Sequence, residues 1–336
     1  MKKIGIIGAG SWGTALAVNL TNNGHRVIIW SIMEDEIKML QENHEHLDKL
    51  PGVKLSDTIG FTSDIETAIK GMDILVLAVP SIFTRSTSKM MAPFVEDNQV
   101  IVCVAKGIED DTLMTITEVV EDEIKNADVC VLSGPSHAEE VGIGLPTTVV
   151  AGARTRQTAE LVQDTFMNEV LRVYSSPDVL GIELGGSLKN VIALAAGMAD
   201  GLGYGDNTKA ALITRGIAEI SRLAVAMGAR PETLNGLTGM GDLIVTCESK
   251  HSRNRKAGML MGQGMTMSEA TKEVKMVVEG VYSAKAAIEL AKRYDVRMPI
   301  IEEVNKVLFE DIPAKEAVTR LMVREKQVEN ASVDWE

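Results

Sequence analysis

Short, continuous runs of apolar residues recur through the first half of the chain, with more polar segments between them. The runs occupy residues 3–7, 26–30, 74–79, 100–104, 129–132 and 147–150. Apolar runs that do not alternate with polar residues are typical of strands covered on both faces. Helical segments are expected between them, around residues 14–23, 33–43, 82–92, 111–124 and 155–168. This alternation predicts an α/β fold with a Rossmann-like, doubly wound parallel sheet.

The second half of the chain has a different pattern. After residues 170–174 the strand signals fade, and long segments rich in Ala, Met, Leu and Glu follow. Pro177 is suited to the start of a helix. A chain of 336 residues exceeds one typical core, so two domains are expected. We assign residues 1–180 to a dinucleotide-binding domain and residues 181–336 to an all-helical domain that carries the substrate and catalytic groups.

A glycine-rich turn joins the first strand to the first helix. Gly8, Gly10 and Gly13 have the spacing G-x-G-x-x-G directly after the strand at residues 3–7. Gly8 can form the tight turn, Gly10 leaves room for a pyrophosphate, and Gly13 lets the helix pack close to the strand. Glycines also mark ordinary turns, but the strand before and the helix after favour dinucleotide binding.

The end of the second strand bears on which cofactor binds. Trp30-Ser31-Ile32-Met33 is followed by Glu34, Asp35 and Glu36, and no Arg or Lys stands in this stretch. A 2′-phosphate would meet three carboxylates and no cation, whereas a ribose hydroxyl needs a hydrogen-bond acceptor. The sequence therefore favours NAD(H). NADP(H) stays possible, because Ser31 could form a hydrogen bond with either group.

The overall charge is −13, with a pI near 5.0. An acidic chain repels phosphate backbones, so nucleic acid is not expected as a partner. The three cysteines, Cys103, Cys130 and Cys247, have neither metal-type nor disulfide-type spacing, which is typical of the cytoplasm. The strand that follows Met1 leaves no room for a signal peptide. No apolar run approaches the roughly 20 residues that span a bilayer, so membrane insertion is not expected.

Polar residues follow several of the expected strands. Lys106 follows the strand at 100–104, where a lysine would lie at the ligand edge of the sheet or on the solvated surface. Ser136 follows a Gly134-Pro135 turn that can present backbone N–H groups. Phe83 could lie against a cofactor or in the core. His137 is a possible acid–base group, but a single histidine near a turn is more often structural.

Lys189 is unusual among the small and apolar residues of its helix. Its neighbours three and four positions away are Gly185, Gly186, Ile192 and Ala193. Three of these are small, so the sequence predicts an open dent around the ammonium. A surface lysine that extends into solvent is the alternative, but two glycines lower helix stability without gain in that case. We therefore interpret Lys189 as functional.

A basic cluster follows Asp242 in this acidic chain. It consists of Ser252, Arg253, Asn254, Arg255 and Lys256. Arginine can bind a phosphate through two parallel hydrogen bonds, and Ser and Asn supply further donors. A solvated basic turn is an equally good interpretation of the cluster alone. No metal site is expected, because His44 and His46 would not face each other on a helix and the methionines suit packing.

Several motifs in the same order resemble one known family. They are G-A-G-S-W-G-T-A at residues 8–15, A-K-G at 105–107, S-G-P-S at 133–136, L-G-G-S-L-K-N-V at 184–191, G-M-G-D-L at 239–243 and S-R-N-R at 252–255. The chain resembles the bacterial soluble NAD(P)-dependent glycerol-3-phosphate dehydrogenases over about residues 4–325. The resemblance implies a helical domain like the C-terminal domain of 6-phosphogluconate dehydrogenase. It also implies reversible reduction of dihydroxyacetone phosphate, a small phosphorylated triose, to sn-glycerol 3-phosphate for phospholipid biosynthesis.

The resemblance also implies roles for individual residues. Lys189 matches the proton donor and acceptor of the family. The positions matching its substrate site are Lys106, Gly134, Ser136, Lys189, Asp242, Ser252, Arg253 and Asn254. Those matching its cofactor site are Ser11, Trp12, Lys106, Ala138, Arg253, Val277 and Glu279, beside Gly8, Gly10 and Gly13. Family members commonly have a basic residue at the position of Ile32, and its absence agrees with NAD(H).

Two other functions fit part of the sequence. A related two-domain dehydrogenase for a β-hydroxy acid or sugar acid would share the fold but leave the Ser252–Lys256 cluster without a purpose. A regulator that senses NAD(H) without chemistry would not need Lys189. Location in the cytoplasm and a homodimer are expected, the latter only from the family.

Overall fold

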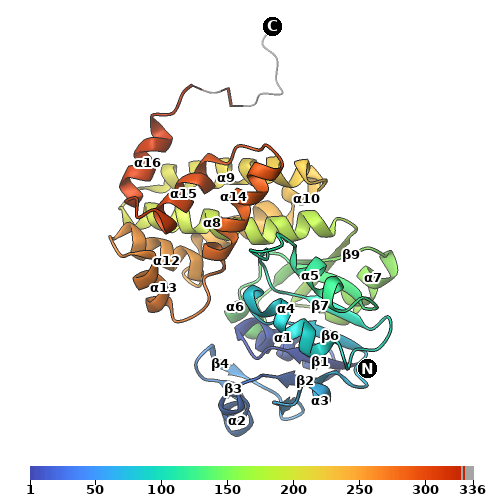
Figure 1. The fold of residues 1–336 in the computed structure, drawn as a ribbon. Coiled ribbons are helices and arrows are strands. Elements are labelled where there is room, and N and C mark those ends of the chain that lie inside the picture. Colours follow the sequence, from blue (N-terminus) through green and yellow to red (C-terminus); the bar gives the residue numbers. More distant parts are fainter. Residues whose placement is uncertain (327, 330–336) are drawn as a thin grey trace.

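The N-terminal half is built on one eight-stranded sheet, seen in a computed structural model that describes residues 1–326, 328 and 329 (Figure 1). The strand order is β10-β9-β8-β7-β6-β1-β2-β5, and neighbours are parallel except for the antiparallel pair β8 and β9. The strands are β1 (Lys3–Ile7), β2 (Arg26–Trp30), β5 (Gly60–Thr62), β6 (Ile74–Leu77), β7 (Val100–Cys103), β8 (Asp128–Ser133), β9 (Thr147–Ala153) and β10 (Leu171–Ser176). The predicted α/β fold is confirmed.

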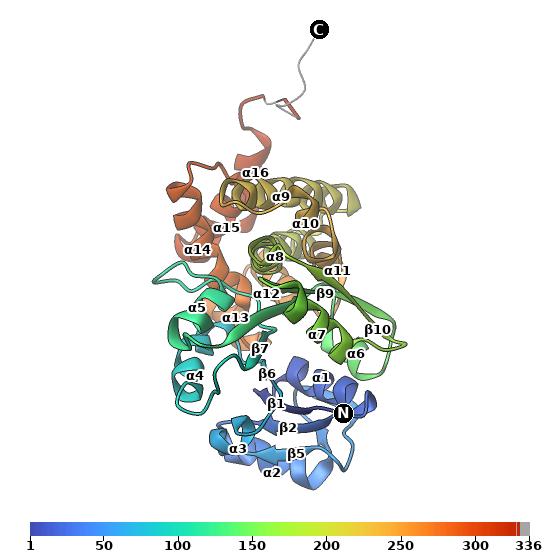
Figure 2. The ribbon, with the colours of Figure 1, turned by 90° about the vertical axis from the view of Figure 1, so that its right-hand side faces the viewer.

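Helices cover both faces of the sheet (Figures 1 and 2). They are α1 (Ser11–Asn22), α2 (Glu34–Asn43), α3 (Ile65–Ile69), α4 (Thr84–Met91), α5 (Ile116–Glu123), α6 (Ala138–Gly142) and α7 (Arg156–Phe166). Successive residues of a strand enter opposite cores: Ile6 packs with one cluster and Ile7 with the other. Two buried faces explain why the central strands are apolar throughout.

Some local features of this half depart from the sequence-based expectation, among them the antiparallel direction of β9. The helix expected over 111–124 begins only at Ile116, because Thr115 and Glu118 form a capping box that fixes its start. A short antiparallel hairpin, β3 (Glu45–His46) and β4 (Leu50–Lys54), follows α2 outside the main sheet. The hairpin was not predicted, since a two-residue strand leaves no periodic signal.

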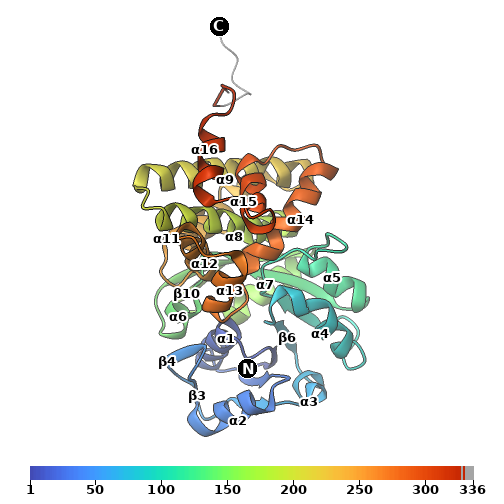
Figure 3. The same cartoon turned by 60° about the vertical axis from the view of Figure 1, so that its left-hand side comes forward.

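The C-terminal half is helical, as expected, and is arranged around α8 (Val179–Gly201) (Figures 1 and 3). The Asp178 carboxylate accepts from the Gly181 N–H and caps this helix, one residue after Pro177. The remaining elements are α9 (Asp206–Ala226), α10 (Pro231–Leu234), the π-turn η2 (Leu237–Gly241), α11 (Asp242–Glu248), α12 (Arg253–Gly262), α13 (Met267–Val274), α14 (Glu279–Arg293), α15 (Pro299–Phe309) and α16 (Ala314–Met322). Since β10 ends at Ser176, the predicted domain boundary at residue 180 falls in the first turn of α8.

The helix α8 is an exception to the expectation that no apolar stretch is long enough to span a bilayer. By length and composition alone this helix could cross a membrane, but 89% of its most apolar window is buried inside the protein. Its apolar side chains form a core with residues of the surrounding helices. This helix was not expected to be long and apolar enough because Glu183, Lys189 and Asn190 interrupt its apolar residues.

The helices α8 and α12 approach each other closely along a seam of four glycines. Gly197 and Gly201 lie on α8, and Gly258 and Gly262 lie on α12. A methyl group at any of these positions would overlap a backbone carbonyl oxygen of the facing helix. Because glycine has no side chain, the backbones of the two helices can lie this close together. This packing places the N-terminus of α12 beside the middle of α8.

We expect Gly197→Ala to destabilise the protein by about 1–3 kcal/mol, because the added methyl group would push α12 away from α8. Denaturant unfolding followed by circular dichroism measures the change. Gly205→Ala is the control: Gly205 has φ −87° and no atom within 4 Å of an added Cβ, so its cost should be much smaller. Equal stability changes in the two variants would contradict the close-packing interpretation.

Candidate active site

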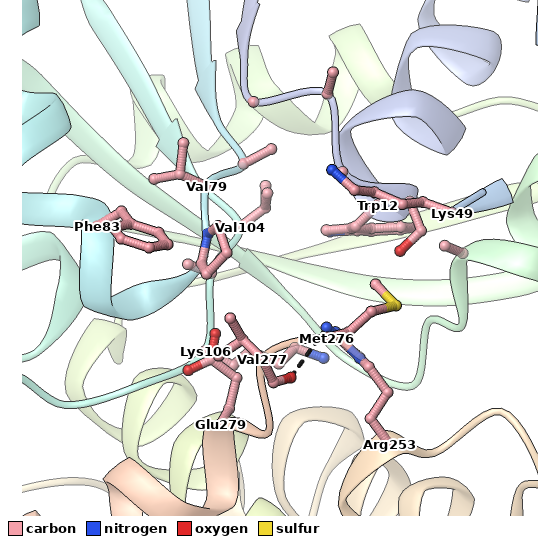
Figure 4. Close-up of a pocket in the computed structure, with 18 of the residues that line it drawn as sticks. Trp12, Lys49, Val79, Phe83, Val104, Lys106, Arg253, Met276, Val277 and Glu279 are labelled. Carbon is pink, nitrogen blue, oxygen red and sulfur yellow. Dashed lines mark hydrogen bonds between the residues drawn. The ribbon is translucent and has the colours of Figure 1, made fainter. Parts of the chain in front are cut away.

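A cavity of about 610 Å³ lies between the carboxyl ends of the parallel strands and the helices of the second half (Figure 4). Most of the predicted site residues line it. They are Gly8, Gly10, Ser11, Trp12, Lys106, Ser136, Ala138, Lys189, Ser252, Arg253, Asn254, Val277 and Glu279. The other three, Gly13, Gly134 and Asp242, lie just behind the cavity wall. The chain thus brings residues that are up to 271 positions apart, Gly8 and Glu279 (279 − 8), into one cleft.

The glycine turn has one glycine for conformation, one for packing and one that leaves space. Gly8 has φ +122°, and a Cβ there would lie 2.8 Å from the Ala78 carbonyl. A Cβ at Gly13 would overlap the carbonyl oxygen of Gly8, so Gly13 permits close packing of α1. Gly10 differs, because its φ of −68° suits any residue and the nearest atom to an added Cβ is 3.9 Å away. The missing side chain at Gly10 only keeps the cleft open.

The open space at Gly10 lies at the N-terminus of α1. Within the described part of the chain, no side chain caps the N-terminus of this 12-residue helix. Its first N–H groups and the positive end of its dipole therefore remain available to an anion. This geometry fits the pyrophosphate of a dinucleotide, which the sequence predicts here.

Two ammonium groups share one buried carboxylate near the middle of the cleft. Asp242 Oδ1 lies 2.7 Å from Lys189 Nζ, and Asp242 Oδ2 lies 2.6 Å from Lys106 Nζ. Lys189 also donates to Thr246 Oγ1 at 2.6 Å, and Lys106 donates to the Gly134 carbonyl at 3.0 Å. The three charged groups come from α8, from the segment after β7 and from the start of α11. Lys189 and Lys106 thus lie on opposite oxygens of one carboxylate.

Burial and neighbouring charge shift the pKa values of this cluster in opposite directions. Burial, with a further contribution from Lys106, lowers the pKa of Lys189 to about 8 although Asp242 opposes the change. Burial alone would raise the pKa of Asp242, but Lys106 and Lys189 lower it overall. Asp242 therefore stays ionised, while Lys189 can hold or release a proton near neutral pH.

The glycines beside Lys189 do not form the open dent that the sequence predicts. A Cβ at Gly185 would lie 2.7 Å from the Thr238 carbonyl oxygen, and one at Gly186 would lie 3.0 Å from Ser133 Oγ and 3.5 Å from Lys106 Cγ. These glycines allow η2 and Lys106 to approach α8. The dent prediction is wrong because the space is filled by neighbours that are distant in the sequence.

The basic cluster divides between the cleft and the helix surface. Ser252 caps α12, accepting from the Arg255 N–H at 3.2 Å, and Arg253 donates to the Val277 carbonyl at 3.2 Å. Arg255 instead pairs with Asp200 at 2.6 Å, and Lys256 is exposed. Only Arg253, of the three cations in the cluster, lines the cleft.

Asn254 fixes the start of α12 between two other helices. Its amide donates to Asn190 Oδ1 on α8 at 2.9 Å, and its Oδ1 accepts from the Gly280 N–H of α14 at 2.9 Å. Both contacts are buried. They hold the N-terminus of α12 against the cleft.

The remaining predicted residues join the strand ends to the helical half. Gly134 has φ +144°, and its carbonyl accepts from Ser136 Oγ at 2.9 Å. Glu279 accepts from the Ser81 N–H at 3.0 Å and from the Ser81 hydroxyl. Phe83 lines the cleft and is 50% exposed, which decides against a place in the core.

The end of the cleft near β2 contains a cation that was not predicted from the sequence. Of Glu34, Asp35 and Glu36, only Glu36 lines the cleft, and its carboxylate pairs with Lys49. The expectation of three carboxylates and no cation is therefore wrong at this position. Lys49 lies in the hairpin between β3 and β4, 13 residues after Glu36, so the stretch after β2 gave no sign of it.

Other cleft residues were also missed or set aside. Thr246 follows Asp242 by four residues on α11, a spacing that could have suggested it as a second partner of Lys189. Ser81, which contacts Glu279 without lining the cavity itself, had no sequence signal apart from its place after β6. His137 lines the cleft, and burial together with Lys189 lowers its pKa.

We expect Asp242→Asn to move the titration of Lys189 to lower pH, because the ammonium loses the carboxylate that favours its charged form. NMR of the ¹³Cε resonance of labelled lysine measures the midpoint, which should lie near pH 8 in the unchanged protein. Asp200→Asn removes the carboxylate that pairs with Lys209 and Arg255 and should leave Lys189 unaffected. A Lys189 midpoint at its ordinary value near 10.5 would contradict this account.

Comparisons with known proteins cover both halves of the chain. The sequence model of the NAD-dependent glycerol-3-phosphate dehydrogenase N-terminus matches residues 3–159, and that of the C-terminus matches residues 178–319. A glycerol-3-phosphate dehydrogenase [NAD(P)+] of Agathobacter rectalis is 76% identical over 335 residues, covering 100% of both chains. The enzyme of that name from Fusobacterium nucleatum is 58% identical, with 98% of this chain and 99% of the relative covered.

A solved structure agrees with these sequence matches. The crystal structure of glycerol-3-phosphate dehydrogenase from Coxiella burnetii has a TM-score of 0.93 at 35% identity, covering 96% of this chain and 99% of that one. The fold, the ordered motifs and the full-length relatives lead to one conclusion. This chain belongs to the NAD-dependent glycerol-3-phosphate dehydrogenase family.

Proposed function

We propose that this chain interconverts dihydroxyacetone phosphate and sn-glycerol 3-phosphate with a nicotinamide cofactor. The observation that carries the proposal is the buried Lys106–Asp242–Lys189 cluster, which lies in a cleft that also holds a dinucleotide-type glycine turn and Arg253. The cleft thus contains both a group that can transfer a proton, Lys189, and a group that can bind the phosphate of the same small molecule, Arg253. The names of the full-length relatives support the same reaction.

The cofactor would occupy the cleft from the glycine turn towards β2. Gly8, Gly10, Ser11, Trp12 and Gly13 would hold the pyrophosphate end, with Lys106, Ala138, Arg253, Val277 and Glu279 as further cofactor positions. When bound, the nicotinamide supplies the hydride that reduces the ketone. Glu36 and Ser31 near the ribose end favour NAD(H), as the sequence suggests.

We propose that Lys189 transfers the proton of the reaction. A carbonyl oxygen that gains a hydride becomes alkoxide-like, and an ammonium held near it stabilises that charge and supplies a proton. A pKa of about 8 suits both directions, because Lys189 can donate when charged and accept when neutral. Asp242 keeps the ammonium in place and Lys106 adds positive charge.

Arg253 is proposed to bind the substrate phosphate. Among the described residues its guanidinium donates one hydrogen bond, to the Val277 carbonyl, which leaves further N–H donors. Ser252 and Asn254 flank it at the start of α12, and Gly134 and Ser136 would complete the substrate site from the sheet. Binding the phosphate at a fixed point turns binding energy into alignment of the carbonyl.

Several further properties are proposed from the resemblance and the sequence. The product would supply glycerophospholipid synthesis, the chain would act in the cytoplasm, and two copies would form a homodimer. The dinucleotide-binding domain would comprise residues 1–180 and the helical substrate domain residues 181–336.

Loss of NADH absorbance on addition of dihydroxyacetone phosphate tests the reaction. We expect rapid oxidation of NADH with this substrate and little with unphosphorylated hydroxy- or keto-acids, because Arg253 would lack its phosphate. Faster reaction with a keto-acid would favour a related hydroxy-acid dehydrogenase. Tight NADH binding with no turnover of any of these substrates would favour a cofactor-sensing regulator.

Replacement of Lys189 and of Arg253 should affect different kinetic constants. Lys189→Met should lower kcat by about 10²-fold or more while the cofactor still binds, because the proton donor is lost. Arg253→Gln should chiefly raise KM for dihydroxyacetone phosphate, by about 10-fold or more, because a charge-assisted contact is lost. Arg255→Gln is the control on the same helix, since Arg255 pairs with Asp200 outside the cleft. Near-normal kcat for Lys189→Met, or an unchanged KM for Arg253→Gln, would contradict the assigned roles.

A further inference from the structure

A small charged network lies at the β2 end of the cleft, away from the reacting groups. The Ser31 hydroxyl donates to Glu36 at 2.5 Å, and His46 Nε2 lies 3.0 Å from the same carboxylate. Lys49 pairs with Glu36 through its ammonium. Ser31, Glu36 and Lys49 all line the cavity, so a ligand that fills this end would contact them.

Glu36 is held in its charged form. Burial alone would raise its pKa, but hydrogen bonds from His46, Lys49 and Ser31 lower the pKa to about 2. Its side chain is only 9% exposed, so water screens the charge weakly. A second negative group placed beside Glu36 would therefore be repelled.

Lys49 supplies the opposite charge at the end of a long side chain. It is 33% exposed, and Figure 4 shows it beside Trp12 at the edge of the cleft. A lysine has a flexible stem, so its ammonium can turn from one anion to another. While Lys49 pairs with Glu36, most of its positive charge is compensated.

We propose that the Glu36–Lys49 pair sets the choice between NAD(H) and NADP(H) in this chain. The end of the second strand in such sheets faces the cofactor ribose, which places Ser31 and Glu36 there. Their oxygens accept hydrogen bonds from an unmodified ribose, and Glu36 both repels a 2′-phosphate and holds Lys49 away from it. This proposal rests on the proposed binding of a nicotinamide cofactor in the cleft.

The proposal assigns the discrimination between NAD(H) and NADP(H) to Glu36, one of three consecutive acidic residues. Glu34 and Asp35 are exposed and do not line the cavity, whereas Glu36 lines it. A general effect of negative charge near β2 would involve all three equally. Glu34→Gln is therefore a matched control, because it removes the same charge from the same helical turn without changing the cleft.

The test compares binding of adenosine 2′,5′-bisphosphate and 5′-AMP by calorimetry, since the two probes differ only in the 2′-phosphate. Glu36→Gln should raise relative affinity for the bisphosphate by about 10-fold or more, because Lys49 is freed for a charge-assisted contact. Lys49→Gln should lower this relative affinity for the bisphosphate, and the double variant should lose the gain seen in Glu36→Gln. Glu34→Gln should change it less than about 2-fold, since exposed charges are screened. NADH and NADPH affinities, followed by tryptophan fluorescence, should move in parallel.

Each contrary result has a distinct meaning. An unchanged ratio in folded Glu36→Gln, or an equal shift in Glu34→Gln, would overturn the assigned discrimination. A gain that persists in the double variant would overturn the role of Lys49. If thermal unfolding shows that Glu36→Gln does not fold, the Lys49→Gln variant tests the proposal instead. A relative affinity for the bisphosphate that does not fall in Lys49→Gln would then overturn it. If the unchanged protein binds neither NADH nor NADPH, the proposed function itself fails.

Discussion

The site depends on one carboxylate shared by two ammonium groups. Asp242 stands at the start of α11, Lys189 is in the middle of α8, and Lys106 follows β7, so a single buried anion ties the sheet to two helices of the other half. Removing these charges from water is costly unless all of them stay paired. The cluster carries one negative and two positive charges, and this excess suits a site where an oxygen gains negative charge. Burial, with a smaller contribution from Lys106, makes Lys189 a weaker base than a free lysine.

Much of the fold could be predicted from the sequence because its signals are local. The continuous apolar runs predicted the central strands. The glycine spacing predicted the turn before α1 and the close packing at Gly13. The later start of α5 could have been predicted from Thr115 and Glu118, which form a recognisable capping pattern. The antiparallel direction of β9 could not, because an apolar run carries no sign of strand direction.

Only the site residues that belong to recognisable sequence motifs could be predicted. Lys189 and the basic cluster around Arg253 stood out in their segments, and Asp242 was indicated by a family motif. The structure places all three at one cleft or its wall. What the sequence could not show was which neighbours arrive from elsewhere. Gly185 and Gly186 suggested empty space, but Thr238, Ser133 and Lys106 fill it. Lys49 reverses the local charge balance from a hairpin that has no periodic signal.

The glycine seam between α8 and α12 has a consequence for how the enzyme tolerates change. An ordinary core adjusts to substitutions because side chains adopt other rotamers, but Gly197, Gly201, Gly258 and Gly262 have none to adjust. A substitution at one of these glycines therefore either preserves the spacing of the two backbones or disrupts it, because little partial adjustment is possible. Because Lys189 and Arg253 lie on those same helices, the distance between the proposed proton-transferring group and the proposed phosphate-binding group stays constant while the surrounding core varies.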